Sequence, residues 1–193
     1  MSPTLLPFTL FALAASISPG PTNLLILAHA ARRGWRASLL PVLAACLAAA
    51  AIVWVVGLGL GDWLLGQPQV QRAMSWLGVA WLSWLALCML RSAGAPLEAT
   101  QGKPFGPGSA AALQLLNPKV WWMAVAVIGV FATPALPVWQ LALVFLLVAL
   151  PSMAAWAWLG ASSARWLQAP GARRLFNRSL AGLLLASAWL TLL

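Results

Sequence analysis

The sequence predicts an all-α integral membrane protein with six transmembrane helices, arranged as two inverted three-helix repeats whose first and fourth helices are broken. Two observations carry this prediction. Hydrophobic residues make up 63% of the 193 residues and charged residues only 7%, whereas a soluble domain carries about 25% charged residues. In addition, two short polar segments, 18–23 and 117–119, interrupt stretches that would otherwise be apolar throughout.

The apolar stretches define the expected spans, because about 20 apolar residues are needed to cross a bilayer as a helix. No Lys or Arg precedes the first stretch, so we expect a retained span rather than a cleaved signal peptide. Little apolar sequence follows Arg178, and five spans with a re-entrant first segment is the alternative topology. The six expected spans are about 4–31, 38–61, 73–90, 109–132, 136–159 and 175–193.

The basic residues predict the orientation of these spans. Positively charged connections stay on the cytoplasmic side of a membrane. Apart from Arg72, and Lys119 within the fourth span, every Lys and Arg falls between spans one and two, three and four, or five and six. Both termini are therefore expected in the periplasm. The basic residues of the three cytoplasmic connections are Arg32, Arg33, Arg36, Arg91, Lys103, Arg165, Arg173, Arg174 and Arg178.

The chain is expected to form a single transmembrane domain, 1–193, made of two halves. The segment 92–108 is rich in Gly and Pro and predicts a cytoplasmic loop between half-repeats at about 1–91 and 109–193. Three spans in each half place the second half upside down relative to the first, as in many secondary carriers. Gly57, Gly59 and Gly61 indicate close helix packing and leave a homodimer open.

The first break is Ser18-Pro19-Gly20-Pro21-Thr22-Asn23. Neither proline has an amide hydrogen, so the helix should stop near Ile17 and restart around Pro21. Ser18 and Pro19 offer a second restart as an N-cap and first-turn pair. Either restart places a helix N-terminus, with its free amides and positive dipole end, inside the membrane, where it suits a carboxylate.

The second break, Asn117-Pro118-Lys119, repeats this logic in the second half. Asn is a good N-cap, and Pro is favoured at the first helical position. An ionisable residue within a span, here Lys119, costs about 2.5–3.5 kcal/mol on insertion scales and indicates a functional site. The substrate-contacting residues predicted from both breaks are Pro19, Gly20, Pro21, Thr22, Asn23, Asn117, Pro118 and Lys119.

Several other functions are disfavoured by what the sequence contains. Asp62 and Glu98 are the only carboxylate side chains and both fall in loops, so no acid pair is available for an enzyme or for coupling within the membrane. Cys46 and Cys88 have no metal-ligand spacing, and no cofactor is expected. The net charge of +9 is spread over short clusters between spans, which argues against nucleic acid as a partner.

These features predict a secondary active transporter that exports a small zwitterionic metabolite, most simply a neutral amino acid. Broken helices in corresponding places of two halves are typical of a carrier's binding site at the bilayer midplane. The alternative is a non-transporting membrane scaffold or assembly subunit, in which the breaks serve only helix packing.

Over nearly its whole length the chain resembles the lysine-exporter superfamily (LysE/RhtB), in its threonine/homoserine efflux branch. The resemblance rests on Ser18-Pro19-Gly20-Pro21, on Arg33-Gly34-Trp35-Arg36-Ala37 and on Asn117-Pro118-Lys119. The segment 77–90 and Gly102-Lys103-Pro104 look most like the cysteine and O-acetylserine exporters of that family.

The resemblance implies export of amino acids or similar metabolites through the bacterial inner membrane, driven by the proton gradient. In many members an Asn directly follows the Pro-Gly-Pro, whereas here Thr22 intervenes before Asn23. A shift of one position turns a helical side chain by about 100°. Asn23 is therefore not expected to take the place of that Asn.

Overall fold

The computed structural model describes residues 5–91 and 105–190, and within these ranges the chain is helical apart from short connections and one isolated β-bridge between Thr133 and Leu136. The 92–108 loop predicted between the halves lies mostly outside the described residues. The α-helices are α1 (Leu5–Ile17), α2 (Pro21–Arg33), α3 (Trp35–Val55), α4 (Gly61–Leu65), α5 (Pro68–Arg91), α6 (Pro107–Leu116), α7 (Pro118–Phe131), α8 (Val138–Ser163) and α9 (Pro170–Trp189).

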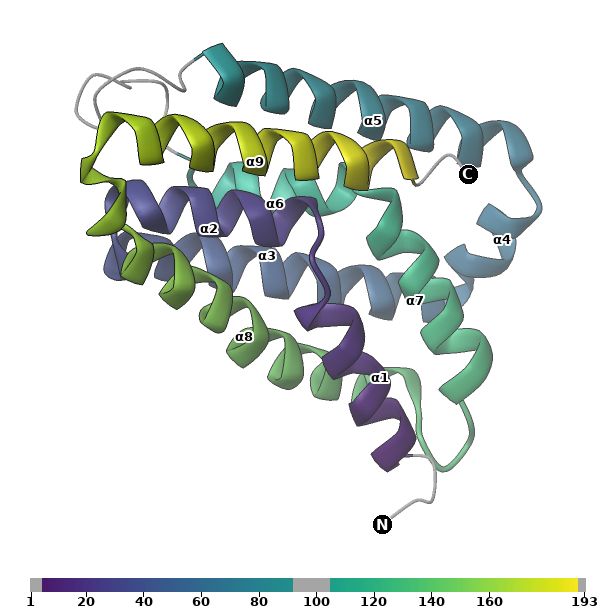
Figure 1. Ribbon diagram of the computed structural model, residues 1–193. Coiled ribbons are helices and arrows are strands. Elements are labelled where there is room, and N and C mark those ends of the chain that lie inside the picture. The colour runs from purple at the N-terminus through teal and green to yellow at the C-terminus, as the bar shows by residue number, and fades with distance from the viewer. Residues whose placement is uncertain (1–4, 92–104, 191–193) are drawn as a thin grey trace.

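The two predicted breaks divide the first and fourth stretches into bent helix pairs. α1 and α2 meet at an angle of 56°, and α6 and α7 meet at 66°. In Figure 1, α2, α3, α5, α6 and α9 run roughly along one direction, while α1 and α7 both turn away from their partners at the break.

Three helical segments are long and apolar enough to cross a membrane, and the count rises to five if each bent pair is one span. The three are Trp35–Leu65, Pro68–Arg91 and Val138–Ser163. α9 does not reach this standard, because its first half carries Arg173, Arg174 and Arg178. The expected sixth span, and with it the inverted six-span plan, stays a prediction.

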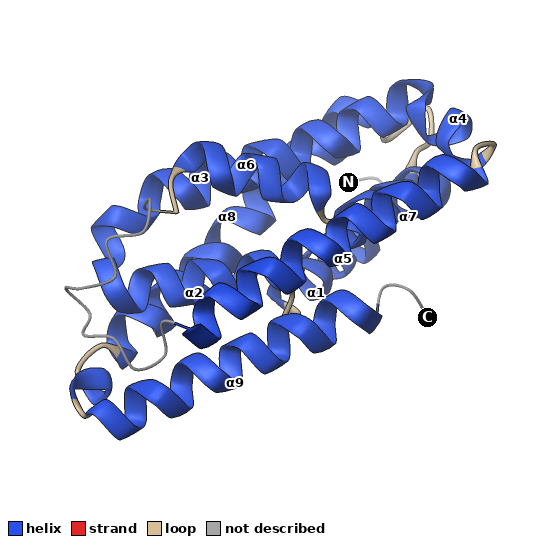
Figure 2. Cartoon of the chain, turned by 90° about the horizontal axis from the view of Figure 1, so that it is seen from above, coloured by secondary structure: helices blue, strands red, loops and turns tan. Residues whose placement is uncertain are grey.

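Helix α9 is nevertheless an integral part of the bundle. It lies along one outer side, next to α5 (Figure 2). Leu180, Ala181 and Leu184 of α9 pack with residues of α2, α5 and α6. The Arg32 guanidinium of α2 donates a 3.2 Å hydrogen bond to the side-chain oxygen of Asn177, a buried residue of α9.

Helix α2 lies at the centre of the bundle, and nearly all of its residues from Pro21 to Ala31 are buried. Ile26 and Ala30 pack into a cluster formed with α1, α3, α7 and α8. Leu24 and Leu25 pack into a second cluster formed with α5, α6 and α9. The start of α2, from Gly20 onward, is therefore enclosed by protein, whereas Pro19 in the first break is exposed.

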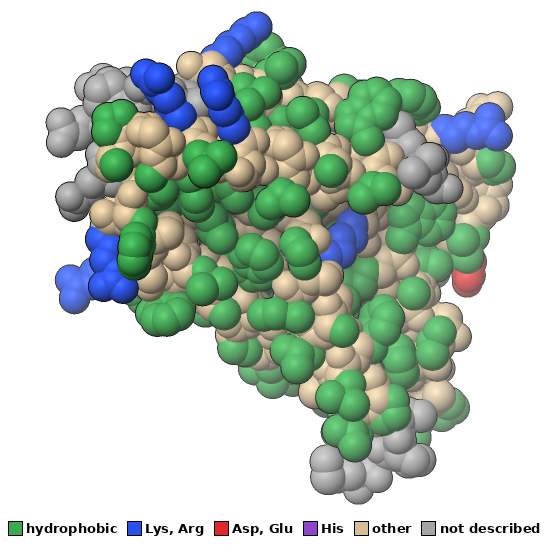
Figure 3. All heavy atoms as spheres, viewed as in Figure 1, with side chains coloured by type: hydrophobic (Ala, Val, Ile, Leu, Met, Phe, Trp, Pro, Cys, Tyr) green, Lys and Arg blue, Asp and Glu red, His purple; other side chains and the backbone are tan. Residues whose placement is uncertain are grey.

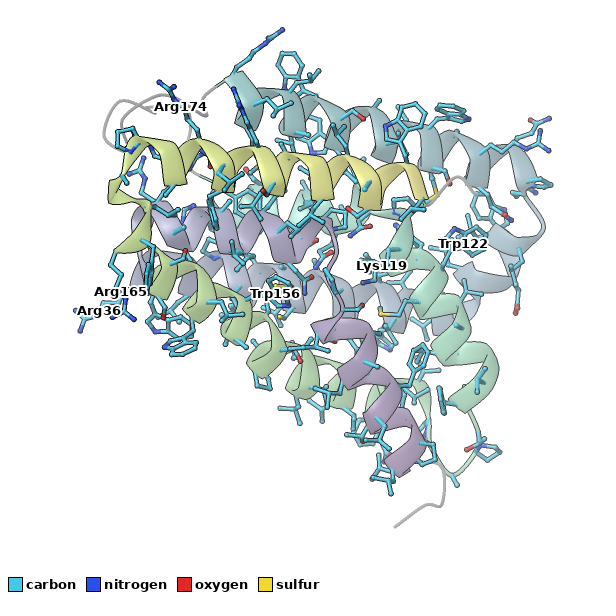
Figure 4. The ribbon with its side chains drawn as sticks, viewed as in Figure 1. Arg36, Lys119, Trp122, Trp156, Arg165 and Arg174 are labelled. Atoms are coloured by element: carbon cyan, nitrogen blue, oxygen red, sulfur yellow. The ribbon has the colours of Figure 1, made fainter. Side chains whose placement is uncertain are left out.

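Most of the basic side chains gather at one end of the molecule. Figure 3 shows blue side chains over the end where α8 finishes and α9 begins, and Figure 4 places Arg36, Arg165 and Arg174 there. This is the asymmetry that the positions of the basic residues predict. Which side of a membrane this end faces stays a prediction.

One glycine of the predicted packing patch is used inside the chain. Gly57 lies in a π-helical turn, Val56–Leu60, that follows α3. A Cβ atom at this position would overlap the Val138 side chain and lie 2.9 Å from Cδ1 of Ile128. The close helix packing is thus confirmed for Gly57, as a contact with α7 and α8 of the same chain, whereas a Cβ atom at Gly59 would meet nothing within 4 Å and one at Gly61 would meet only Val56.

Candidate functional site

The first break has the boundaries that its prolines predict. α1 ends at Ile17, and α2 begins at Pro21 with Gly20 as its N-cap. The restart at Ser18 and Pro19 is wrong, because Ser18 belongs to the end of α1: its amide donates to the Ala14 carbonyl, and its hydroxyl to the Ala15 carbonyl. No side chain caps Gly20, and the first-turn amides of a helix have no partner within the helix.

The second break is capped as expected. Asn117 is the N-cap of α7, and its side-chain oxygen accepts a 3.2 Å hydrogen bond from the Lys119 amide. Pro118 occupies the first turn, where its missing amide hydrogen removes no helical bond.

The two breaks meet through Lys119. Its ammonium donates a 2.8 Å hydrogen bond to Oγ of Ser18 and a 3.4 Å bond to the Ser18 carbonyl. The same side chain passes so close to Gly20 that a Cβ atom there would lie 3.2 Å from Nζ. Figure 4 shows Lys119 in the middle of the molecule, far from the labelled arginines. A positive charge from one half is thus held at the broken helix of the other half.

A chain of polar side chains makes a second connection between the halves. The Thr22 hydroxyl donates to Oε1 of Gln114 at 3.0 Å, and Nδ2 of Asn117 lies 3.5 Å from the Thr22 oxygen. Nε2 of Gln114 donates to the Ala45 carbonyl of α3 at 3.2 Å. Thr22, Gln114 and Asn117 are all buried. The bonds therefore fix the start of α2 against the end of α6.

Gln114 was not among the residues predicted from the sequence. The signal that could have found it is an amide side chain within the apolar stretch 109–132, three residues before Asn117. An uncharged polar residue in a span is tolerated where neighbouring helices satisfy its hydrogen bonds, and Thr22 and Ala45 do so here.

The carbonyl groups freed at the breaks are satisfied by side chains. Nδ2 of the Asn23 side chain donates to the Ser16 carbonyl at 2.9 Å, and the Trp156 indole of α8 donates to the Ile17 carbonyl at 3.2 Å. At the second break, the Trp121 indole donates to the Leu115 carbonyl at 2.9 Å. Each broken helix thus has a tryptophan indole on a carbonyl of its last turn.

Replacing Trp156 with Phe removes this donor and keeps an aromatic ring. An ordinary hydrogen bond contributes about 0.5–1.5 kcal/mol net, so we expect the initial rate of transport in reconstituted vesicles to fall about two- to tenfold. Trp158→Phe is the matched control, since Trp158 is 61% exposed on the same helix. Equal rates for both variants would show that the Ile17 contact does not position the break.

A cavity of about 50 Å³ lies between the breaks and the helices α3 and α8. One water needs about 10–15 Å³ on this scale, so the cavity has room for a small solute. Its polar residues are Ser16, Gly20, Thr22, Asn23, Gln114, Asn117 and Lys119; its apolar residues are Ala15, Cys46, Ala49, Val120, Met123, Phe145, Ala149 and Met153.

The predicted residues divide into two groups in this cavity. Gly20, Thr22, Asn23, Asn117 and Lys119 line it. The three prolines do not: Pro19 is exposed, and Pro21 and Pro118 are buried behind the lining. The prolines therefore shape the backbone without facing the cavity. Ser16 and Gln114 are the polar lining residues that sequence reasoning missed, each from a helical turn beside a break.

The charge and the free hydrogen-bonding groups of the cavity lie at one end of it. Lys119 is the only charged residue among the described residues that line it. Oγ of Ser16 is buried without a hydrogen-bond partner, which is an uncommon and costly state for a hydroxyl. The cavity thus offers one cation, the first turn of α2 and one unpartnered hydroxyl at its polar end.

Broken helices that meet at a shared cavity with polar side chains define a class of protein, the helical membrane transporters. The comparison with known proteins shows the family: residues 13–192 match the model of the LysE type translocator, and the chain belongs to that family. It is a translocator and not an enzyme.

Curated relatives agree with this family. The chain is 32% identical over 136 residues to proteins named cysteine/O-acetylserine efflux protein in Escherichia coli (strain K12) and Shigella sonnei. It is 31% identical to the protein of that name in Salmonella typhi. Each match covers 69% of this chain and 69% of the relative. No solved structure matches the chain.

Proposed function

We propose that this protein is a secondary active transporter that exports a small zwitterionic metabolite, a neutral amino acid, through the bacterial inner membrane. The proposal includes the six-span inverted plan with both termini in the periplasm. The observation that carries it is the contact between Lys119 and Ser18, which sets an ammonium group of one half beside the broken helix of the other half at a shared cavity.

The polar end of the cavity is complementary to the headgroup of an amino acid. A carboxylate placed here meets the Lys119 ammonium and the N-terminal turn of α2, and both favour negative charge. The substrate ammonium finds an acceptor in the unpartnered Oγ of Ser16. Recognition of a zwitterion thus needs no acidic side chain.

The relatives support the same class of substrate. Cysteine and O-acetylserine, which the names of the Escherichia coli and Salmonella relatives specify, are small amino acids with uncharged side chains. A cavity with one cation and no carboxylate among its described lining residues suits such molecules.

Opening toward the periplasm is proposed to separate the outer segments of the two broken pairs. Phe131, at the end of α7, packs against Phe8 and Phe11 of α1, with ring centroids 5.3 and 5.6 Å apart. These rings lie beyond the breaks, in the segments that turn away from the basic end (Figure 1). Helices α1 and α7 are joined to α2 and α6 at the breaks. A substrate bound at the breaks therefore contacts the same two bent helix pairs that the aromatic contact holds together.

Coupling to the proton gradient is also part of the proposal. Asp62 is exposed in α4, and Glu98, the other carboxylate residue, lies outside the described residues. Lys119 is the titratable side chain that contacts the substrate in this scheme. If Lys119 releases a proton on one side of the membrane and takes one up on the other, proton movement depends on whether the substrate carboxylate is bound.

Transport by the purified full-length protein in lipid vesicles tests the function. We expect uptake of radiolabelled cysteine or alanine into vesicles that contain the protein. The rate of uptake should increase when the vesicle interior is more acidic than the outside, because protons then leave as the substrate enters. Protein-free vesicles are the control. Lack of transport for any neutral amino acid, with the protein folded and inserted, would favour the scaffold alternative, and transport without an effect of pH would remove the coupling.

A further inference from the structure

The wall opposite the breaks is built by two helices without a break at the cavity. Phe145, Ala149 and Met153 of α8 line the cavity at intervals of four residues, and Cys46 and Ala49 of α3 line it three residues apart. Residues at these spacings share one face of a helix. Helices α3 and α8 pack against each other along their length. The wall is therefore part of the hydrophobic core of the bundle.

This wall differs from the polar end in its chemistry. Its five side chains are between 1% and 6% exposed and belong to one hydrophobic cluster. A charged substrate side chain placed against it would lose its hydration without gaining a partner, which is unfavourable. A methyl, thiol or thioether group is weakly hydrated, so its contact with this wall carries no such penalty. The cavity is thus polar at the broken helices and apolar at α3 and α8.

The two alanines determine how much room the wall leaves. Ala49 and Ala149 lie on facing helices and both are buried, at 5% and 4% exposure. Larger side chains at either position would extend into a cavity of only about 50 Å³. Phe145 and Met153, one helical turn before and after Ala149, close the space on both sides along α8.

We propose that Ala49 and Ala149, together with Met153, form a selectivity wall that sets the size of the substrate side chain. The wall admits amino acids with a small uncharged side chain and rejects large or charged ones, while the broken helices bind the common headgroup. This inference rests on the proposed function, and it assigns headgroup binding and side-chain selection to different helices.

Three variants of the full-length protein test the wall in lipid vesicles. The initial rates of uptake are measured for glycine, alanine, cysteine, methionine, leucine and lysine. Ala149→Leu and Ala49→Leu fill the cavity, and we expect the cysteine-to-glycine rate ratio to fall by about tenfold or more. Such a change is typical when a hydrophobic pocket differs by one or a few methylene groups. Met153→Ala enlarges the cavity, and we expect the methionine-to-glycine rate ratio to rise.

The matched control is Ala155→Leu, the same substitution at an exposed position of α8. It should leave all ratios unchanged. Because rate ratios within one variant do not depend on the amount of folded protein, partial loss of expression does not imitate the effect.

Two results separate the inference from the function. Unchanged ratios in the variants that still transport glycine, or a ratio change in Ala155→Leu of the same size, would overturn the selectivity wall and leave the transporter intact. A wild-type protein that transports none of the six amino acids would instead overturn the proposed function. If both leucine variants fail to fold, the ratio for Met153→Ala decides.

Discussion

Lys119→Met should lower export about 10- to 100-fold while the protein remains folded. The substitution keeps a long side chain and removes the only charge among the described residues that line the cavity. A hydrogen bond to a charged group contributes about 1.5–3 kcal/mol, which corresponds to this loss if the ammonium contacts the substrate carboxylate. Efflux from preloaded cells and uptake into vesicles both measure it.

Thermal unfolding of the same variant separates binding from folding. An ionisable group within a span costs about 2.5–3.5 kcal/mol on insertion scales, so its removal should leave the melting temperature unchanged or higher. Ser18→Ala is the companion variant: it removes one acceptor of Lys119 and keeps the charge, and it should retain most of the transport. Unchanged transport by Lys119→Met, at normal expression, would end the assignment of the carboxylate contact.

Gly78→Ala should also abolish most transport, although Gly78 does not line the cavity. Gly78 lies on α5 directly against the second break. A Cβ atom there would overlap the Leu116 carbonyl oxygen and lie 2.9 Å from Cδ of Pro118. Because both neighbours are backbone or a rigid ring, either α5 or the break must move. We expect a loss of more than about tenfold in rate and a destabilisation of about 1–3 kcal/mol, as for other overpacked positions.

Gly129→Ala and Gly182→Ala are the matched controls for this prediction. Both glycines are helical, and a Cβ atom at either position meets no atom within 4 Å. Alanine favours a helix over glycine by about 1 kcal/mol, so these variants should be at least as stable as the wild type and equally active. Gly78→Ala with the activity of these controls would show that α5 does not position the break.

The positions of both breaks could be predicted from the sequence because their causes are local. Pro21 cannot donate to the preceding turn, and Asn117 followed by Pro118 is a strong start signal for a helix. The structure confirms that α1 ends at Ile17, that α2 begins at Pro21 and that Asn117 caps α7. The sequence could not decide between Ser18 and Gly20 as the N-cap, since both residue types fit the capping rules.

The partners of the break residues could not be predicted, because they come from distant parts of the chain. Lys119 is 101 residues from Ser18, and Trp156 is 139 residues from Ile17. Gln114 differs from its apolar neighbours in being polar, but its partners are not encoded locally, and nothing in the sequence around Gly78 distinguishes it from other glycines in apolar helices. Their importance depends on which helix packs against which, and the helix-packing angles follow from the whole bundle.

The sequence by itself determined that the chain is a helical membrane protein, where its first and fourth stretches are broken, and that a lysine lies within one of them. These properties follow from composition, from the missing proline amide and from helix capping. Only the tertiary structure decided that the breaks meet at one cavity, that Ser16 and Gln114 face it, and that α3 and α8 supply its apolar wall. The physical reason is that hydrophobic burial is non-directional: an apolar stretch encodes that it is buried, whereas its neighbours depend on close packing throughout the folded chain.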